Sequence, residues 1–213
     1  MLYLALSCLQ GRPLDRAAAE LLALLPGELG LQLTPGCAPG PVPGHVATRT
    51  HHGWVPQALR AAVWAGGELV WRGDSVHPPA AQEVGPGWTP PDDVVLETMF
   101  PGYALLSCGE ELARAMQDGR WLAVDVAHLQ IQRHHGVLAG SVWDRLADYD
   151  RIAEVHVSAS IDRRDAHAPV SKDTWGLDWA RARLWSGTPV VLECYMHHLD
   201  EDARRRQIAE VLR

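Results

Sequence analysis

Short apolar runs alternate with helix-like stretches along most of the chain. The runs are rich in Val, Leu and Ile and nearly continuous, which is typical of parallel strands covered on both faces. Eight runs are predicted strands: Leu2–Ser7, Gly30–Leu33, Val46–Thr50, Ser75–His77, Val94–Thr98, Trp121–Val126, Ala153–Ser158 and Pro189–Cys194. Helices are predicted at Pro13–Leu25, Gly109–Gln117, Ser141–Tyr149 and Asp200–Leu212. This order of strand and helix indicates an α/β protein with a parallel sheet.

Eight parallel strands in succession favour closure into a (β/α)8 TIM barrel. With 213 residues the barrel would be compact, near the low end of the usual size range. The chain contains no internal repeat, so residues 1–213 are interpreted as one barrel domain. Two stretches rich in Pro and Gly, Thr34–Gly44 and Ala65–Pro91, are candidates for a lid over the barrel mouth.

Composition narrows the functional class only slightly. The net charge of -7 predicts no general attraction to nucleic acid or to an anionic membrane, although a local patch or bound metal would still permit DNA binding. No apolar run is long enough to span a bilayer. The apolar start of the chain lacks a basic segment and a cleavage site, so a first buried strand is expected rather than a signal peptide.

The cysteines and histidines carry more information. Cys8, Cys37, Cys108 and Cys194 form no C-x-x-C pair, which favours reduced thiols in a cytoplasmic protein. The chain has 11 histidines, and histidine is the commonest protein ligand for metals.

Acids and imidazoles stand at the ends of six consecutive predicted strands. They are His51 with His52, His77, Glu97, Asp125 with His128, His156 with Asp165 and His167 in the loop that follows it, and Glu193. Each one alone would more often be a hydrogen-bonded core residue or an ion-pair partner. In a parallel barrel, however, all six strand ends meet at one rim. Burying so many ionisable groups together is costly unless metal ions compensate them, so the pattern predicts a metal site.

The number of candidates indicates more than one ion. A single catalytic ion uses about four protein ligands or fewer. The sequence offers more than that, which favours two or three divalent ions that share bridging carboxylates. Glu97 and Glu193 are the expected bridges.

These motifs resemble the endonuclease IV and xylose isomerase-like TIM-barrel superfamily. The most specific pieces are the D-x-x-H of Asp125 and His128, the D-x-H of Asp165 and His167, and the final Glu193. The resemblance to endonuclease IV implies three zinc ions and the ligands His51, His77, Glu97, Asp125, His128, His156, Asp165, His167 and Glu193. His51 is preferred to His52 because Trp54 stands three residues after it, where family members carry an aromatic residue.

Two related families remain open as alternatives. Sugar isomerases and epimerases of the superfamily bind one divalent ion, and Glu97, Asp125, His156 and Glu193 match their ligands. Multinuclear iron-dependent oxidases, which modify peptides, use a very similar series. They commonly carry Asn three residues after the strand-six Asp, whereas this chain has His128, as in the zinc pattern.

Phosphoester hydrolysis by metal-activated hydroxide is therefore the first functional hypothesis, with zinc favoured over iron or manganese. Isomerisation, in which Glu97 and Glu193 are ligands or a proton-shuttling pair, is the second. Oxidation of a peptide or small molecule and a catalytically silent metal-stabilised scaffold are the others. The substrate could be a small molecule, a peptide or a nucleic-acid phosphoester, and no membrane partner is expected. The chain is shorter than endonuclease IV, and its loop after the second strand lacks basic residues, which weakens the case for DNA.

Three further residues are candidates for substrate contacts. Trp54 could stack on a base or simply cover the barrel mouth. Arg163 and Arg164 precede the D-x-H motif and could bind an anionic group, or could merely be exposed. His134 and His135 are expected in a loop after the sixth strand, outside the site.

Overall fold

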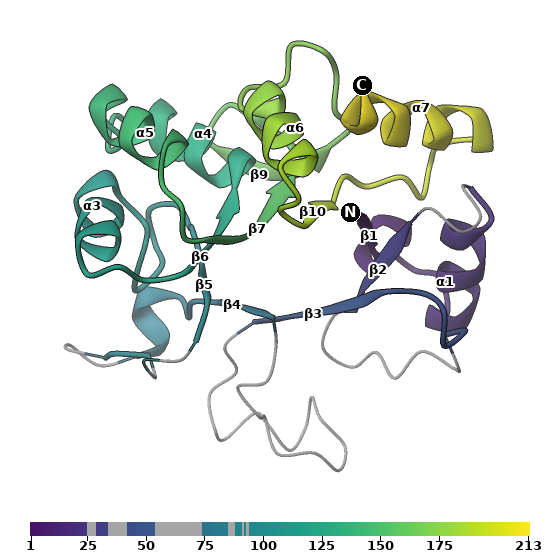
Figure 1. Cartoon of the computed structure of the whole chain (residues 1–213), viewed down its shortest axis with the longest axis horizontal. Coiled ribbons are helices and arrows are strands. Elements are labelled where there is room, and N and C mark those ends of the chain that lie inside the picture. Colours follow the sequence, from purple (N-terminus) through teal and green to yellow (C-terminus); the bar gives the residue numbers. More distant parts are fainter. Residues whose placement is uncertain (25–28, 34–41, 54–73, 85–87, 91, 93) are drawn as a thin grey trace.

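Eight parallel strands close into a single barrel, as the apolar runs predicted (Figure 1). This computed structural model describes residues 1–24, 29–33, 42–53, 74–84, 88–90, 92 and 94–213. Each barrel strand pairs with the next one along the chain, and the last strand pairs with the first. The barrel strands are β1 (Leu2–Ala5), β2 (Gly30–Leu33), β3 (Thr48–Gly53), β4 (Ser75–His77), β5 (Leu96–Glu97), β6 (Leu122–Asp125), β7 (Ile152–Val157) and β10 (Val190–Leu192).

The predicted strand bounds agree with the structure to different degrees. The predicted bounds of β2 and β4 match the structure, and β5 is shorter than predicted. Strand β3 lies further along the chain than predicted, because its polar residues pair with both neighbours while Val46 closes a turn on Pro43. Inter-strand pairing therefore overrides the apolar signal at that strand.

The helices lie outside the barrel (Figure 1). They are α1 (Leu14–Leu22), α3 (Gly109–Gln117), α4 (Val126–His134), α5 (Gly140–Ala147), α6 (Leu177–Trp185) and α7 (Glu201–Leu212), with 3-10 turns η1 (Leu6–Leu9) and η2 (Ala81–Glu83). Helix α3 has the predicted bounds, and Gly119 follows it with a φ of 69°, a left-handed conformation that suits glycine after a helix end.

One helix and one hairpin replace predicted loops. His134 is the last residue of α4 and His135 caps it, so the loop expected around these histidines is wrong. The segment containing the D-x-H motif is an antiparallel hairpin of β8 (Ala159–Ile161) and β9 (Arg164–Ala168). The hairpin lies against α4 and carries the motif on a strand instead of a loop.

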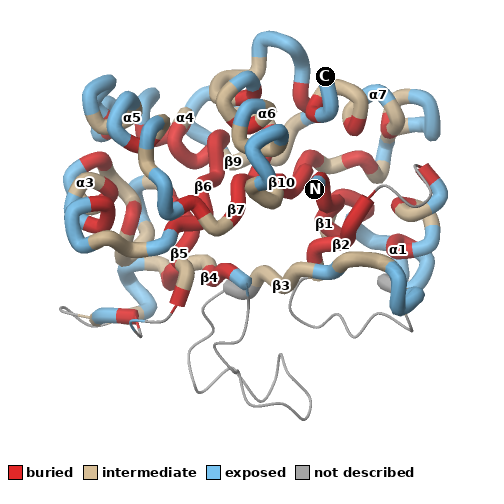
Figure 2. The backbone as a smooth tube through the Cα atoms, in the orientation of Figure 1, coloured by how far each residue is buried: buried red, intermediate tan, exposed pale blue. Residues whose placement is uncertain are grey.

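The core has an apolar part and a polar part. Buried residues concentrate on the barrel strands and on the inner faces of the helices (Figure 2). Leu4, Leu31 and Val124 belong to the apolar core. The buried polar residues, listed here together, are Gln32, Ser75, Glu97, Thr98, Asp125, His128, Gln132, Glu154, His156, Ser158, Glu193 and Arg204. Most of them come from barrel strands and the residues that directly follow them.

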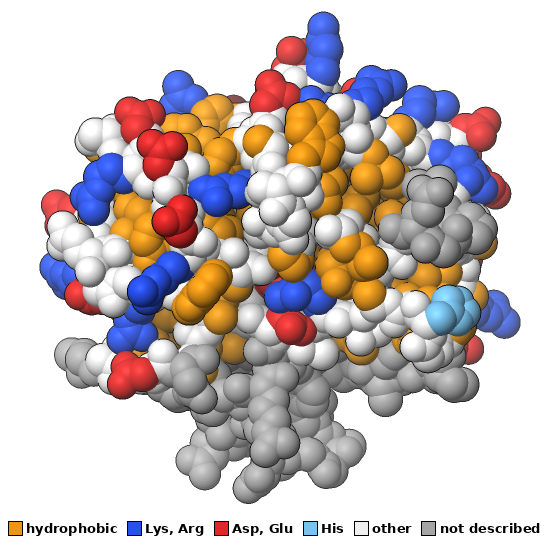
Figure 3. All heavy atoms as spheres, in the orientation of Figure 1, with side chains coloured by type: hydrophobic (Ala, Val, Ile, Leu, Met, Phe, Trp, Pro, Cys, Tyr) orange, Lys and Arg blue, Asp and Glu red, His pale blue; other side chains and the backbone are white. Residues whose placement is uncertain are grey.

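One face of the molecule is mixed in charge. On the face drawn in Figure 3, basic and acidic side chains are interspersed among apolar ones. Among the described residues, no helix has the length and apolar character required to cross a membrane. Cys8, Cys108 and Cys194 are free thiols.

Candidate metal centre

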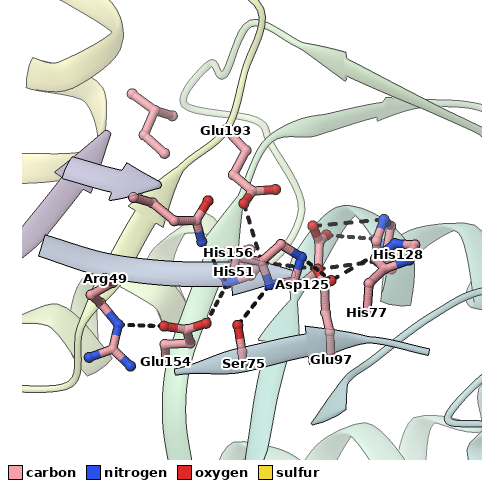
Figure 4. Close-up of polar contacts among 12 residues, drawn as sticks. Arg49, His51, Ser75, His77, Glu97, Asp125, His128, Glu154, His156 and Glu193 are labelled. Atoms are coloured by element: carbon pink, nitrogen blue, oxygen red, sulfur yellow. Dashed lines mark hydrogen bonds and ion pairs between the residues drawn. The ribbon is translucent and has the colours of Figure 1, made fainter. Parts of the chain in front are cut away.

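Glu97 lies at the centre of a cluster of imidazoles at the carboxyl end of the barrel (Figure 4). It is the last residue of β5, and only 1% of its surface is exposed. Glu97 Oε2 lies 3.2 Å from His51 Nε2 and 4.0 Å from His77 Nε2. Glu97 Oε1 lies 2.9 Å from His156 Nδ1 and 3.6 Å from His128 Nδ1. One carboxylate therefore contacts imidazoles from β3, β4, β7 and α4.

Asp125 and His128 are fixed to each other by the start of α4. Asp125 ends β6 and is the N-cap of α4, where its Oδ1 accepts a hydrogen bond of 2.9 Å from the His128 backbone N–H. The ring Nδ1 of His128 lies 2.8 Å from the Thr98 carbonyl oxygen and donates to it, so Nε2 points toward Asp125 and Asp165. His128 Nε2 then faces Asp125 Oδ2 at 3.9 Å. The D-x-x-H spacing thus presents one carboxylate oxygen and one ring nitrogen to the same space.

Asp165 and His167 reach the cluster from the hairpin. Asp165 Oδ2 lies 3.3 Å from His128 Nε2 and 3.2 Å from His167 Nε2, so this carboxylate joins two imidazoles. His167 has a φ of 42°, which is uncommon for a residue other than glycine. Its carbonyl accepts a 2.7 Å hydrogen bond from Tyr195 N–H, and its ring stacks on the Tyr195 ring at 4.8 Å. The hydrogen bond stabilises the uncommon backbone conformation of His167, and the stacking fixes the position of its ring.

Four buried residues, Glu97, Asp125, His156 and Glu193, form one group that could hold a metal ion. One ligand atom from each lies within 4.8 Å of the others, and all four residues are buried. Glu193, which directly follows β10, contacts the ring of His156, with 3.4 Å between Oε1 and Nδ1. A second group of this kind, His51, Glu154 and His156, shares the same histidine.

Unpaired polar atoms in the cluster fit a bound cation. Within the described part of the chain, Asp125 Oδ2, Asp165 Oδ1 and His167 Nδ1 are buried and have no hydrogen-bond partner. A buried polar atom without a partner is costly, and native structures contain few of them. A divalent cation would compensate the two carboxylate oxygens, and the N/O donor set suits zinc, iron or manganese. The buried groups are therefore chemically able to hold metal ions.

Mutual charge compensation shifts the pKa values of these groups. Burial lowers the pKa of His77 to about 4. Burial also disfavours charge on His128, but the nearby carboxylates of Asp125, Asp165 and Glu97 outweigh it and raise the pKa of His128 to about 10. Burial is likewise outweighed at His167, where Asp165 raises the pKa to about 9. For Glu97 the imidazoles of His156 and His51 outweigh burial and hold its pKa well below the ordinary value.

We expect zinc uptake at pH 7 to release protons and to weaken as the pH falls. His128 and His167 have raised pKa values and are protonated at this pH without metal, whereas a cation binds only the neutral ring. Calorimetric titration with zinc in buffers of different ionisation enthalpy measures this release. Zinc affinity independent of pH between about 6 and 9 would contradict it.

His128 and His167 also make the stability of the metal-free protein depend on pH. Their charged forms stabilise the fold fully below the ordinary histidine pKa of 6.5. This stabilisation is lost as the pH rises through their raised pKa values of about 9 for His167 and about 10 for His128. The melting temperature of the metal-free protein should therefore fall over this range. A melting temperature that rises with pH over the same range would contradict this assignment.

The structure brings all of the proposed metal ligands into one connected cluster. The side chain of His52 lies outside the described residues, as does Trp54. Arg163 and Arg164 are exposed at the hairpin turn. Strand alternation places Arg164 on the face of β9 opposite Asp165, so its role in substrate binding stays a prediction.

Sequence reasoning missed Glu154 and Arg49. Glu154 is buried beside His156, and Arg49 forms an ion pair with it. The available signal was the A-E-V-H of β7: residues two apart on a strand share a face, so Glu154 accompanies His156 into the barrel.

A comparison with models of known protein families finds no match for this chain. A search of curated proteins likewise finds no similar sequence.

Proposed function

We propose that this chain is a metal-dependent enzyme of the endonuclease IV and xylose isomerase-like superfamily that hydrolyses a phosphoester at a centre of two or three divalent ions. The observation that carries the proposal is the continuity of the cluster. Glu97 contacts the rings of His51, His77, His128 and His156, and these contacts extend through His128 to Asp165 and His167. So many linked ligands exceed the needs of one ion.

The proposed ligands divide between the two ends of the cluster. Glu97, Asp125, His156 and Glu193 would hold an ion in the buried part. Asp165, His128 and His167 would serve the more accessible part, where the side chains of Asp165 and His167 are 21% and 20% exposed. When bound, clustered divalent ions lower the pKa of water, neutralise phosphate charge and stabilise the leaving oxygen.

Neighbouring residues orient the proposed ligands, and an arginine provides a positive charge for the substrate. The Thr98 carbonyl oxygen orients the ring of His128, and the His128 backbone N–H orients the carboxylate of Asp125. Tyr195 stacks on the ring of His167. Arg163, exposed at the hairpin turn beside the Asp165 strand, is the proposed contact for an anionic substrate group.

Hydrolysis of bis(p-nitrophenyl) phosphate tests the reaction class. We expect chelator-treated protein to be inactive and added zinc to restore activity, with manganese or iron as alternative activators. A duplex with an abasic site and a small phosphodiester, assayed together, separate nucleic-acid from small-molecule substrates. A protein that binds several zinc ions but cleaves no phosphoester would contradict the proposal, and bound iron with a visible absorption band would favour an oxidase.

One observation favours a sugar isomerase or epimerase as a second candidate. Glu97, Asp125, His156 and Glu193 form a fully buried group that could hold one ion, and by resemblance this set suffices for a single-ion isomerase. In that reaction Glu97 and Glu193 would be ligands or would move a proton between adjacent carbons of the sugar. Exchange of a sugar carbon-bound proton with deuterated water, supported by one manganese or magnesium ion per chain, would favour this candidate.

A further inference from the structure

A second carboxylate lies directly behind the buried histidine of the cluster. Glu154 stands two residues before His156 on β7, and both side chains are fully buried. Glu154 Oε1 lies 2.9 Å from His156 Nε2, while His156 Nδ1, on the other side of the ring, lies 2.9 Å from Glu97 and 3.4 Å from Glu193 (Figure 4). The imidazole is therefore placed between a rear carboxylate and the two carboxylates of the candidate centre.

The rear carboxylate has its own counter-charge. Glu154 Oε2 accepts a hydrogen bond of 2.5 Å from Arg49 Nε on β3. The Arg49 guanidinium also lies 3.6 Å from Asp74 Oδ1 and over the Tyr3 ring at 5.8 Å, so it is held from several sides. Oε2 of Glu154 thus pairs with Arg49 and Oε1 with His156, and the Ser75 side chain also hydrogen-bonds this carboxylate.

This arrangement argues against a further metal ion at Glu154, although His51, Glu154 and His156 offer atoms close enough to hold one. A cation bound there would face the Arg49 guanidinium across Glu154, and the two positive charges would repel each other. In addition, His51 Nδ1 is already engaged by Ser75 Oγ at 2.7 Å, which leaves His51 Nε2 facing Glu97.

We infer that Glu154, held by Arg49, is a positioning residue that accepts the Nε2–H of His156 and so presents Nδ1 of that ring to the metal centre. The inference rests on the proposed metal centre. A histidine that binds metal through one nitrogen commonly donates its other N–H to a carboxylate, which fixes the ring and increases its basicity as a ligand. Gln32 Nε2, 3.3 Å from His156 Nε2, lines the same rear side of the ring.

Zinc affinity of matched variants tests the inference, measured by competition with a chromophoric chelator. Glu154→Gln keeps the size of the side chain and removes its charge, and Arg49→Met removes the counter-charge. We expect both to bind zinc roughly 10- to 100-fold more weakly than the wild type, and Arg49→Lys to recover part of the loss. Glu20→Gln is the control, because it also breaks a Glu–Arg pair, with Arg204, but away from the cluster.

Long-range proton–nitrogen NMR of the zinc-loaded wild type gives a second readout. We expect the ring of His156 to carry its proton on Nε2 and to bind zinc through Nδ1. A proton on Nδ1, or unchanged zinc affinity in Glu154→Gln and Arg49→Met, would overturn the inference. The NMR result decides the matter even if Glu154→Gln does not fold. A wild type that takes up no zinc would instead refute the proposed metal centre itself.

Discussion

Glu97→Gln is expected to lower zinc affinity more than about 100-fold, beyond the loss typical of a residue that only supports a ligand. The buried carboxylate contacts the rings of His51, His77, His128 and His156, and the amide removes its charge from all of these contacts. Metal content after purification and chelator competition measure the effect. Phosphoester hydrolysis should fall with metal content.

The matched control for this variant is Glu201→Gln. Glu201 is exposed on α7 and pairs with Arg205, so the same change there should leave zinc affinity unaltered. Circular dichroism should show that Glu97→Gln keeps its helices. Wild-type zinc affinity in a folded Glu97→Gln protein would exclude Glu97 as a shared ligand.

The second large effect is expected from His128→Ala and His167→Ala. Both imidazoles contact Asp165, outside the buried group of Glu97, Asp125, His156 and Glu193. Each variant should therefore lose the ions of the more accessible part and retain about one ion per chain, held by the buried group. Hydrolysis should fall below detection in both variants. Metal analysis per chain measures the stoichiometry directly.

His135→Ala is the control for these histidine variants. His135 is exposed at the end of α4, and its replacement should change neither metal content nor activity. If His128→Ala and His167→Ala keep both the metal content and the activity of the wild type, the multinuclear centre is wrong. The single-ion isomerase would then be the better interpretation.

The barrel was predictable because its strands are buried on both faces. Nearly continuous apolar runs such as those of β6 and β10 would be exposed to water outside a sheet covered on both faces. Eight such strands in succession along the chain therefore indicate a closed parallel barrel. The hairpin of β8 and β9 has no such run. Its strands are half-buried or exposed and carry charged residues, so local composition resembles that of a loop.

Helix α4 was missed for a different reason. The apolar pattern continues from β6 into α4 without a connecting loop, because Asp125 is both the last strand residue and the helix N-cap. Periodicity cannot separate a short strand from a helix that follows it immediately.

The candidate ligands were predictable from their places at strand ends. Glu154 and Arg49, which hold the ring of His156 from behind, were not. Acids and imidazoles that follow apolar runs must meet at one rim once the barrel closes. Glu154 lies within β7 rather than at its end, and its partner Arg49 is distant in sequence. Only the register of the closed barrel brings the two together across its interior.

Anomalous X-ray diffraction from crystals soaked in zinc tests the metal centre most directly. Two or three anomalous peaks are expected, at least one within about 2.0–2.2 Å of a Glu97 oxygen and others beside Asp165 and His167. Zinc-soaked crystals with no peak near Glu97, and with its carboxylate still paired only to the surrounding imidazoles, would contradict a metal centre at this end of the barrel.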